Sequence, residues 1–233
     1  MRLINSNLIC FLFGCICLWS CNTAQNGNAI PTEVNDKSDQ EDLKTDSFDI
    51  LISDYENEDR VIWQKPGVVI DLLGDLSDKT VADLGAGSGY FAFRLLPSAQ
   101  KVLALDIDPR AIFYMDSIKS TLPDEISSKL ELRLVGTGNA GMKPAEVDAV
   151  LLVNTYMYLG DRVSYLNNLR EMIKPGGQII IIDFKKKSMP IGPPLDEKVD
   201  LSVVESELKA AGFKIFSSND TTLDYQYIIK ATR

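Results

Sequence analysis

Residues 81–90, VADLGAGSGY, decide the fold of this chain. The first four are apolar except for Asp83, which predicts a buried β-strand, and the mostly apolar residues 91–96 predict a short helix. Between these segments, three glycines let the backbone turn sharply with no Cβ between it and a ligand: Gly85, Gly87 and Gly89. Free amide groups at a helix start favour polar or anionic groups, so the turn predicts a site for a nucleotide-like ligand.

The spacing of the glycines selects among such ligands. A dinucleotide fingerprint places its glycines as G-x-G-x-x-G to seat a pyrophosphate. This chain has G-x-G-x-G, and Tyr90 stands where the last glycine of that fingerprint would be. A dehydrogenase is therefore the least favoured of three functional interpretations.

Three segments, in order along the chain, resemble class I S-adenosylmethionine-dependent methyltransferases. The stretch from Asp83 to Gly89 resembles the first motif of that family. Residues 101–106, KVLALD, form a second short strand pattern ending in an acid, roughly 20 residues after the turn, where a carboxylate can accept hydrogen bonds from ribose hydroxyls. Residues 173–177, IKPGG, resemble the family's link from its fourth helix into its fifth strand. The resemblance runs from about residue 60 to the C-terminus.

The resemblance implies a fold, a cofactor and an activity. The fold is α/β, a Rossmann-like seven-stranded and mostly parallel sheet flanked by helices, with the last strand antiparallel. Strand and helix patterns that alternate along the chain agree with it. The cofactor is S-adenosylmethionine, and the activity is methyl transfer to a small-molecule or protein acceptor that the sequence does not identify.

The resemblance also assigns cofactor-binding residues. The three glycines would contact the methionyl and ribose parts, Asp83 the methionine amine through the turn, and Asp106 the ribose. Thr137 stands where the family commonly has an acid that receives the adenine amino group. Arg60, in a segment similar to one of a bacterial subgroup, would meet the methionine carboxylate. The full predicted set is Arg60, Asp83, Gly85, Gly87, Gly89, Asp106, Ile107, Thr137 and Asn154.

Two residues are candidates for catalysis. Tyr156 and Asp183 follow the fourth and fifth predicted strands, at the carboxyl edge where open α/β sheets place ligands. The chain has no histidine that could accept a proton. A neutral tyrosine is a poor base at its usual pKa near 10, so Asp183 is the preferred proton acceptor and Tyr156 the alternative.

Composition narrows the chemistry and the partners. A net charge of -9 argues against DNA or RNA as the main partner, because phosphate contacts need clustered Lys and Arg. The absence of histidine removes Ser-His-Asp and Cys-His nucleophile systems and every His-ligated metal site. All four cysteines lie within the first 21 residues, so no metal site is predicted in the rest of the chain. Methyl transfer from a sulfonium needs neither a histidine nor a metal site.

The N-terminal segment predicts export. Residues 1–21 have a basic residue near the start, an apolar run too short to span a bilayer comfortably, and Cys21 at the end of a stretch that resembles a bacterial lipoprotein cleavage box. Cys21 would become the lipidated first residue of a bacterial cell-envelope lipoprotein, anchored to a membrane on the periplasmic side. A retained hydrophobic anchor is the alternative.

Two further segments complete the domain organisation. Residues 22–47 are acidic and polar with few large apolar residues, which predicts a disordered linker, and residues 48–233 form the methyltransferase-like domain. The second functional interpretation is a catalytically degenerate, membrane-tethered module of the same fold that binds a nucleoside or a protein. Thr137 favours this alternative slightly, whereas the glycine turn and Asp106 weigh against it.

Overall fold

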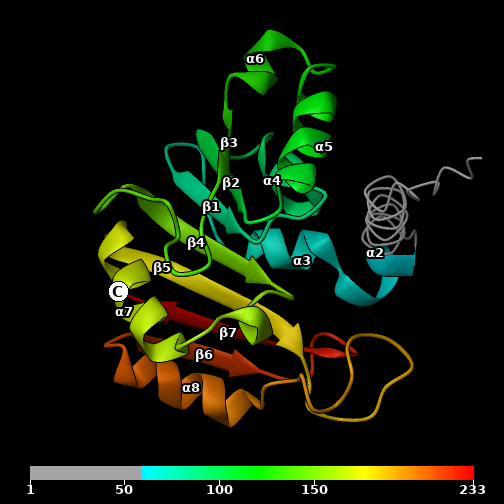
Figure 1. Cartoon of the computed structure of the whole chain (residues 1–233), viewed down its shortest axis with the longest axis vertical. Helices are drawn as coiled ribbons and strands as arrows, with labels where there is room; N and C mark the ends of the chain where they lie inside the picture. The colour runs from blue at the N-terminus through cyan, green and yellow to red at the C-terminus, as the bar shows by residue number, and fades with distance from the viewer. Residues whose placement is uncertain (1–58) are drawn as a thin grey trace, which may run out of the picture.

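The computed structural model describes residues 59–233, which form a seven-stranded sheet in the order β3-β2-β1-β4-β5-β7-β6. Every pair is parallel except β5 with β7 and β7 with β6, so only β7 runs against the others. The strands are β1 Thr80–Leu84, β2 Lys101–Asp106, β3 Leu130–Leu134, β4 Val147–Val153, β5 Ile173–Phe184, β6 Lys214–Asn219 and β7 Gln226–Thr232. Figure 1 shows β1 and β4 in the middle of the sheet.

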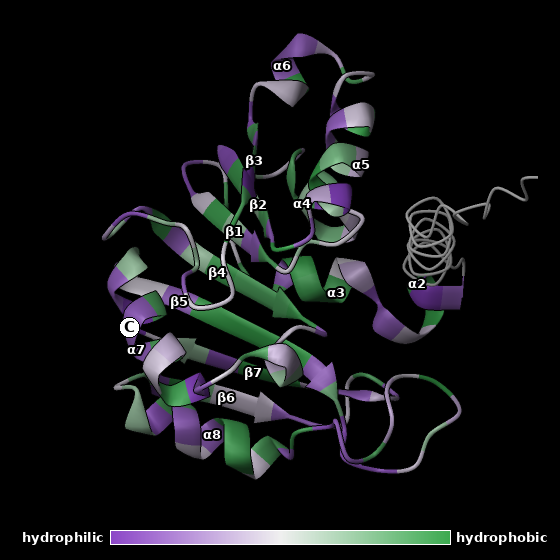
Figure 2. Ribbon diagram, viewed as in Figure 1, coloured by the Kyte–Doolittle hydropathy of each residue, from purple (hydrophilic) through white to green (hydrophobic). Residues whose placement is uncertain are grey.

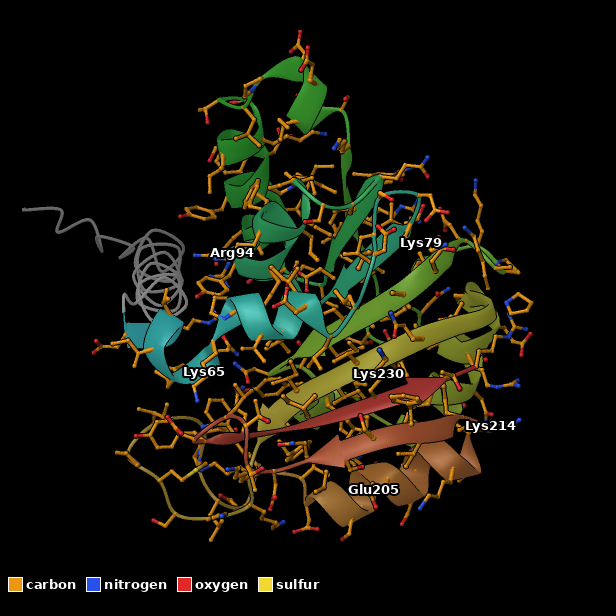
Figure 3. All side chains as sticks on the ribbon, turned by 180° about the vertical axis from the view of Figure 1, so that it is seen from behind. Lys65, Lys79, Arg94, Glu205, Lys214 and Lys230 are labelled. Atoms are coloured by element: carbon orange, nitrogen blue, oxygen red, sulfur yellow. The ribbon has the colours of Figure 1, made fainter. Side chains whose placement is uncertain are left out.

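Helices cover both faces of the sheet (Figure 1). The α-helices are α2 Asp59–Gln64, α3 Pro66–Asp71, α4 Tyr90–Leu95, α5 Pro109–Lys119, α6 Asp124–Ser127, α7 Arg162–Met172 and α8 Leu201–Ala210, and η1 is a short 3-10 helix, Tyr156–Tyr158. α7 and α8 pack on one face, and α3, α4 and α5 pack on the other. Lys230 extends from β7 on the α3 side, where its Nζ donates to the Leu72 carbonyl at 2.8 Å (Figure 3).

Burial explains the central strands. β4 and residues 179–182 of β5 are nearly continuous runs of apolar residues, as expected for strand segments whose two faces are both covered by helices. Figure 2 shows these two strands as the most hydrophobic ribbons, with a paler β6 at the sheet edge. Because β1, β2, β4 and β5 are parallel, their carboxyl ends lie at the same edge of the sheet. A closely packed core supports this edge.

The expected fold class is confirmed. Asp200 is the N-cap of α8, and its carboxylate accepts from the Ser202 amide at 2.9 Å. The predictions of a signal segment at residues 1–21, of lipidation at Cys21 and of a linker at residues 22–47 lie outside the described residues.

Asp108 gives a direct test of helix capping. Its carboxylate accepts from the Arg110 amide at 2.9 Å, and Pro109 occupies the first turn of α5. We expect Asp108→Ala to lower the free energy of unfolding by about 1 kcal/mol in denaturant titration, because it leaves an amide donor of the first turn without its partner. Asp116→Ala, at an exposed position within the same helix, is the matched control and should not destabilise the protein. Equal destabilisation by the two variants would contradict the capping role.

Candidate functional site

The glycine turn is held against β2 by its own backbone. The amides of Gly85 and Ala86 both donate to the Leu105 carbonyl, at 2.8 and 3.1 Å. Gly85 has a φ of 77°, and a Cβ there would lie 2.4 Å from the Thr155 hydroxyl oxygen. Only glycine fits this position, because a side chain would meet both a left-handed backbone and the loop after β4.

Asp106 joins the end of β2 to the turn. Its Oδ2 accepts from the Gly87 amide at 2.7 Å, and its Oδ1 accepts from the Asp108 amide at 2.9 Å. A carboxylate that accepts two amides is fixed in orientation, and its remaining lone pairs are available to a ligand. The acid predicted from its spacing to the turn is thus in direct contact with the turn.

A cavity of about 220 Å³ opens beside these groups. It lies between the carboxyl ends of β1, β2 and β4 and the loop after β3, which is the edge where the sequence predicted a ligand. Its lining includes six predicted residues, namely Gly85, Gly87, Asp106, Ile107, Thr137 and Asn154. Gly89 does not line it, since it is the N-cap residue of α4 on the far side of the turn.

A smaller cavity of about 30 Å³ continues from the same wall. Arg60 lines it together with the turn residues Gly85 and Gly87 and with Asn154 and Thr155, which follow β4. The Arg60 side chain is buried, and its guanidinium carbon lies 4.0 Å from the centre of the Tyr90 ring. The structure therefore brings Arg60, from α2, to the sheet edge where the turn and Asn154 lie.

Asp83 lies beneath the turn rather than in either cavity. The residue is 3% exposed, and its Oδ2 has no hydrogen-bond partner among the described residues. Burial raises the pKa of its carboxyl to about 7, against the opposing effects of the Ala92 amide and the Arg60 charge. A buried acceptor without a partner is available to a cationic or hydrogen-bond-donating ligand.

The two predicted catalytic residues lie outside the lining of both cavities. The Tyr156 side chain is fully buried against α8, where its hydroxyl donates to Glu207 at 2.5 Å. Asp183 is 1% exposed, and its carboxylate accepts from the amides of Met157 and Phe184 at 3.3 and 2.7 Å. Asp183 thus ties β5 to η1, and its catalytic role stays a prediction.

Comparison with known proteins agrees with this geometry. Residues 82–179, which run from β1 into β5, match the family model described as a methyltransferase domain. Over these residues the chain is similar to a methyltransferase domain.

Curated relatives show further similarities. The chain is 26% identical over 107 residues to the tRNA U34 carboxymethyltransferase of Nautilia profundicola, covering 46% of this chain and 35% of that protein. It is 27% identical over 175 residues to the demethylmenaquinone methyltransferase of Lactococcus lactis, covering 70% and 65%. The chain thus spans about a third of the length of the former relative and about two thirds of the latter.

The crystal structure of a SAM-dependent methyltransferase from Aquifex aeolicus superposes with a TM-score of 0.72 at 23% identity, covering 78% of this chain and 96% of that one. A second SAM-dependent methyltransferase, from Mesorhizobium loti, superposes with a TM-score of 0.61 at 14% identity, covering 72% and 96%. At these identities the likeness is one of fold.

The site at the carboxyl edge of the sheet has groups that fit S-adenosylmethionine. The turn around Gly85 has no room for a Cβ, Asp106 presents a fixed carboxylate beside the larger cavity, and the Asp83 oxygen lacks a partner. Within the part of the chain that the structure describes, no group of three or more potential metal ligands is present. Among residues 59–233, no helix has the length and apolarity needed to cross a bilayer.

Sequence reasoning missed several residues of the site. Thr155 and Tyr158 line the larger cavity, and their position directly after the fourth strand was a usable signal. Gln64 and Gln226 are fully buried and hydrogen-bonded to each other at 3.2 Å, although they are 162 positions apart. No local pattern marks such a pair, because the two glutamines are brought together only by the folding of distant segments.

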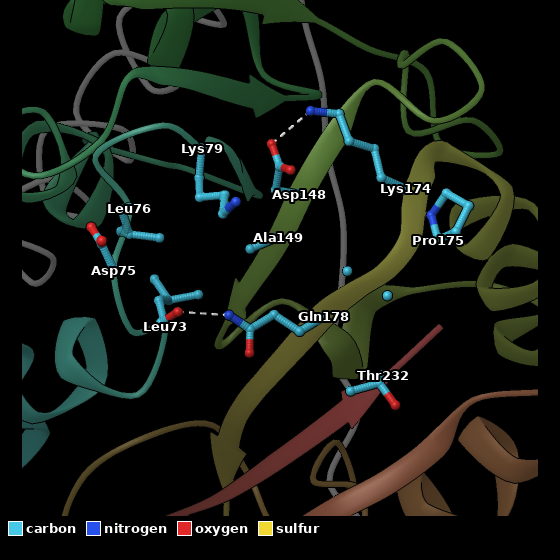
Figure 4. Close-up of a pocket in the computed structure, with 12 residues that line it drawn as sticks. Leu73, Asp75, Leu76, Lys79, Asp148, Ala149, Lys174, Pro175, Gln178 and Thr232 are labelled. Carbon is cyan, nitrogen blue, oxygen red and sulfur yellow. Dashed lines mark hydrogen bonds and ion pairs between the residues drawn. The ribbon is translucent and has the colours of Figure 1, made fainter.

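A further cavity, of about 360 Å³, lies at the opposite edge of the sheet (Figure 4). Its lining includes Lys79, Asp148, Lys174 and Gln178. Lys174 pairs with Asp148 at 2.8 Å, and Gln178 donates to the Leu73 carbonyl at 2.7 Å. Asp148, Lys174 and Gln178 thus have hydrogen-bond partners within the protein.

The buried acids predict a pH dependence of stability. Burial raises the pKa of the Asp183 carboxyl to about 7, as it does for Asp83. An acid whose pKa is raised on folding holds its proton more tightly in the folded state, so the free energy of unfolding falls as pH rises from about 4 to about 7. We expect Asp183→Asn to reduce that slope in denaturant titrations across this range. Asp116→Asn, at an exposed position, should leave it unchanged, and an unaltered slope in Asp183→Asn would contradict the assignment.

Proposed function

We propose that the domain binds S-adenosylmethionine and transfers its methyl group to an acceptor. The observation that carries the proposal is the cavity of about 220 Å³ in which the glycine turn and the fixed carboxylate of Asp106 face one space. A carboxylate there can accept both ribose hydroxyls, and Thr137 lies on the wall formed by the loop after β3, where an adenine would be held.

The residues of this chain act mainly by orientation. S-adenosylmethionine supplies an already activated methyl group, so the protein needs to align donor and acceptor and to exclude water. Arg60 and Asn154 line the smaller cavity beside the turn, which we assign to the amino-acid end of the cofactor. Asp83, beneath the turn, has a buried oxygen without a hydrogen-bond partner among the described residues, and we assign this acceptor to the cofactor's ammonium group.

Asp183 remains the proposed proton acceptor for substrates that lose a proton. A pKa of about 7 suits a general base at neutral pH. Tyr156 is the weaker candidate, because burial raises the pKa of its phenol well above the usual value and its hydroxyl is bonded to Glu207.

The acceptor is proposed to be a small molecule or a protein. Two of the relatives are named for activity on a tRNA and on demethylmenaquinone, and these names describe those proteins. A net charge of -9 disfavours a nucleic acid as the partner of this chain. The degenerate binding module is less well supported, since the turn, Asp106 and Asn154 converge on one cavity.

Asp106 provides the test of cofactor binding. We expect Asp106→Ala to weaken binding of S-adenosylmethionine by at least about tenfold in calorimetry, because charge-assisted hydrogen bonds contribute roughly 1.5–3 kcal/mol each. Asp108→Ala is the control, since that carboxylate caps α5 and does not line the cavity. Similar losses in both variants, or no binding by the unaltered protein, would refute the proposal.

We also propose that the protein is a cell-envelope lipoprotein anchored through Cys21, which would attach the domain to a membrane on the periplasmic side. Support comes from the sequence alone, since residues 1–21 and the linker at 22–47 lie outside the described residues. We expect a radiolabelled fatty acid to be incorporated into the full-length protein and to be lost in Cys21→Ser, while Cys17→Ser retains it. A soluble cytosolic protein that keeps Met1 would contradict the proposal.

A further inference from the structure

Four side chains from three separate parts of the chain form one continuous hydrogen-bonded series. Arg60 Nε donates to Gln64 Oε1, and Gln64 Nε2 donates to Gln226 Oε1 at 3.2 Å. Gln226 Nε2 then donates to Asn154 Oδ1. The series begins on α2, passes through the first residue of β7 and ends directly after β4.

The series is buried. Gln64 and Gln226 are 0% exposed, and Arg60 is 6% exposed. A buried amide group that lost its partner would be left unsatisfied, so each bond of the series helps to keep the others in place. Asn154 also has a φ of 57°, a left-handed backbone that orients its side chain differently from that of an ordinary strand residue.

Arg60 sets the direction of the whole series. A guanidinium has only N–H donors, so Gln64 must turn its oxygen toward Arg60 and its nitrogen toward Gln226. Gln226 must then turn its oxygen toward Gln64 and its nitrogen toward Asn154. The oxygen of Asn154 is therefore committed to Gln226, and the group that Asn154 can offer to the cavity is its N–H donor.

We propose that Gln64 and Gln226 are positioning residues that hold Arg60 and Asn154 as paired donors for a carboxylate in the cavity of about 30 Å³ that both line. This inference rests on the proposed function, in which the carboxylate belongs to the amino-acid end of the cofactor. A guanidinium and an amide N–H that line one space match the acceptor oxygens of a carboxylate. The glutamines act through Arg60 and Asn154 and need no contact with the ligand.

Two ligands separate positioning from simple support of the fold. S-adenosylhomocysteine has the amino-acid end, whereas 5′-methylthioadenosine has the same nucleoside without it. We expect Gln226→Met in the full-length protein to weaken S-adenosylhomocysteine binding by about tenfold in calorimetry, since the orientation of a charge-assisted contact is lost. Binding of 5′-methylthioadenosine should change by less than about twofold.

A double-mutant cycle tests whether the series acts as a unit. Gln64→Met breaks the link to Arg60 on the short helix α2, outside the sheet, and provides the test should Gln226→Met fold poorly. We expect Gln64→Met to weaken S-adenosylhomocysteine binding to a similar extent. We expect the double variant to bind this ligand about tenfold, rather than about a hundredfold, more weakly than the unaltered protein. A single break already removes the constraint that orients the remaining side chains, so a second break adds little.

Gln178→Met is the matched control. Gln178 and Gln226 lie at opposite ends of the same β5–β7 pair, and the Gln178 amide donates to Leu73 beside the far cavity (Figure 4). This control should leave the affinities for both ligands unchanged. If Gln226→Met weakened the binding of both ligands equally, or if the losses of affinity in the cycle were additive, the inference would be overturned while the proposed function would stand. Failure of the unaltered protein to bind either ligand would overturn the proposed function.

Discussion

The site depends on the attachment of the glycine turn to β2. Leu105 accepts two amides of the turn through its carbonyl, and the neighbouring Asp106 accepts a third through its carboxylate. Strand pairing thus fixes the shape of the turn as well as the sheet. Because Gly85 is pressed against Thr155, the same contact sets the distance between the turn and the loop after β4. Three strand ends are thereby brought into one fixed arrangement, which is how the cavity acquires its walls.

Buried polar groups are concentrated at this edge of the sheet. Asp83, Asp183, Gln64 and Gln226 are all almost completely buried at or near the carboxyl ends of the parallel strands. Each costs stability unless its hydrogen bonds are made, and the Asp83 oxygen is left without a partner among the described residues. A bound ligand could supply the hydrogen-bond partner that this oxygen lacks. The opposite edge differs, because Asp148, Lys174 and Gln178 there have partners within the protein.

The sequence predicted the features that local pattern encodes. The glycine turn and the acid at the end of the second strand each follow from residues close together in the chain, and the structure has both. The seven-stranded sheet followed from family resemblance. Local pattern did not reveal that Tyr156 is buried beneath α8. Its hydroxyl donates a hydrogen bond to Glu207, which is 51 positions away in the sequence. Local pattern also missed Gln64 and Gln226, whose burial depends on the pairing of distant segments.

The place of β7 in the sheet decides which half of the site depends on the last described strand. β7 lies between β5 and β6, and its first residue, Gln226, links Gln64 to Asn154. Every residue that lines the cavity of about 220 Å³ precedes β5 in the chain, whereas the connection from Arg60 to Asn154 needs β7. Under the proposed function, full affinity for the cofactor therefore requires the last strand to be in place.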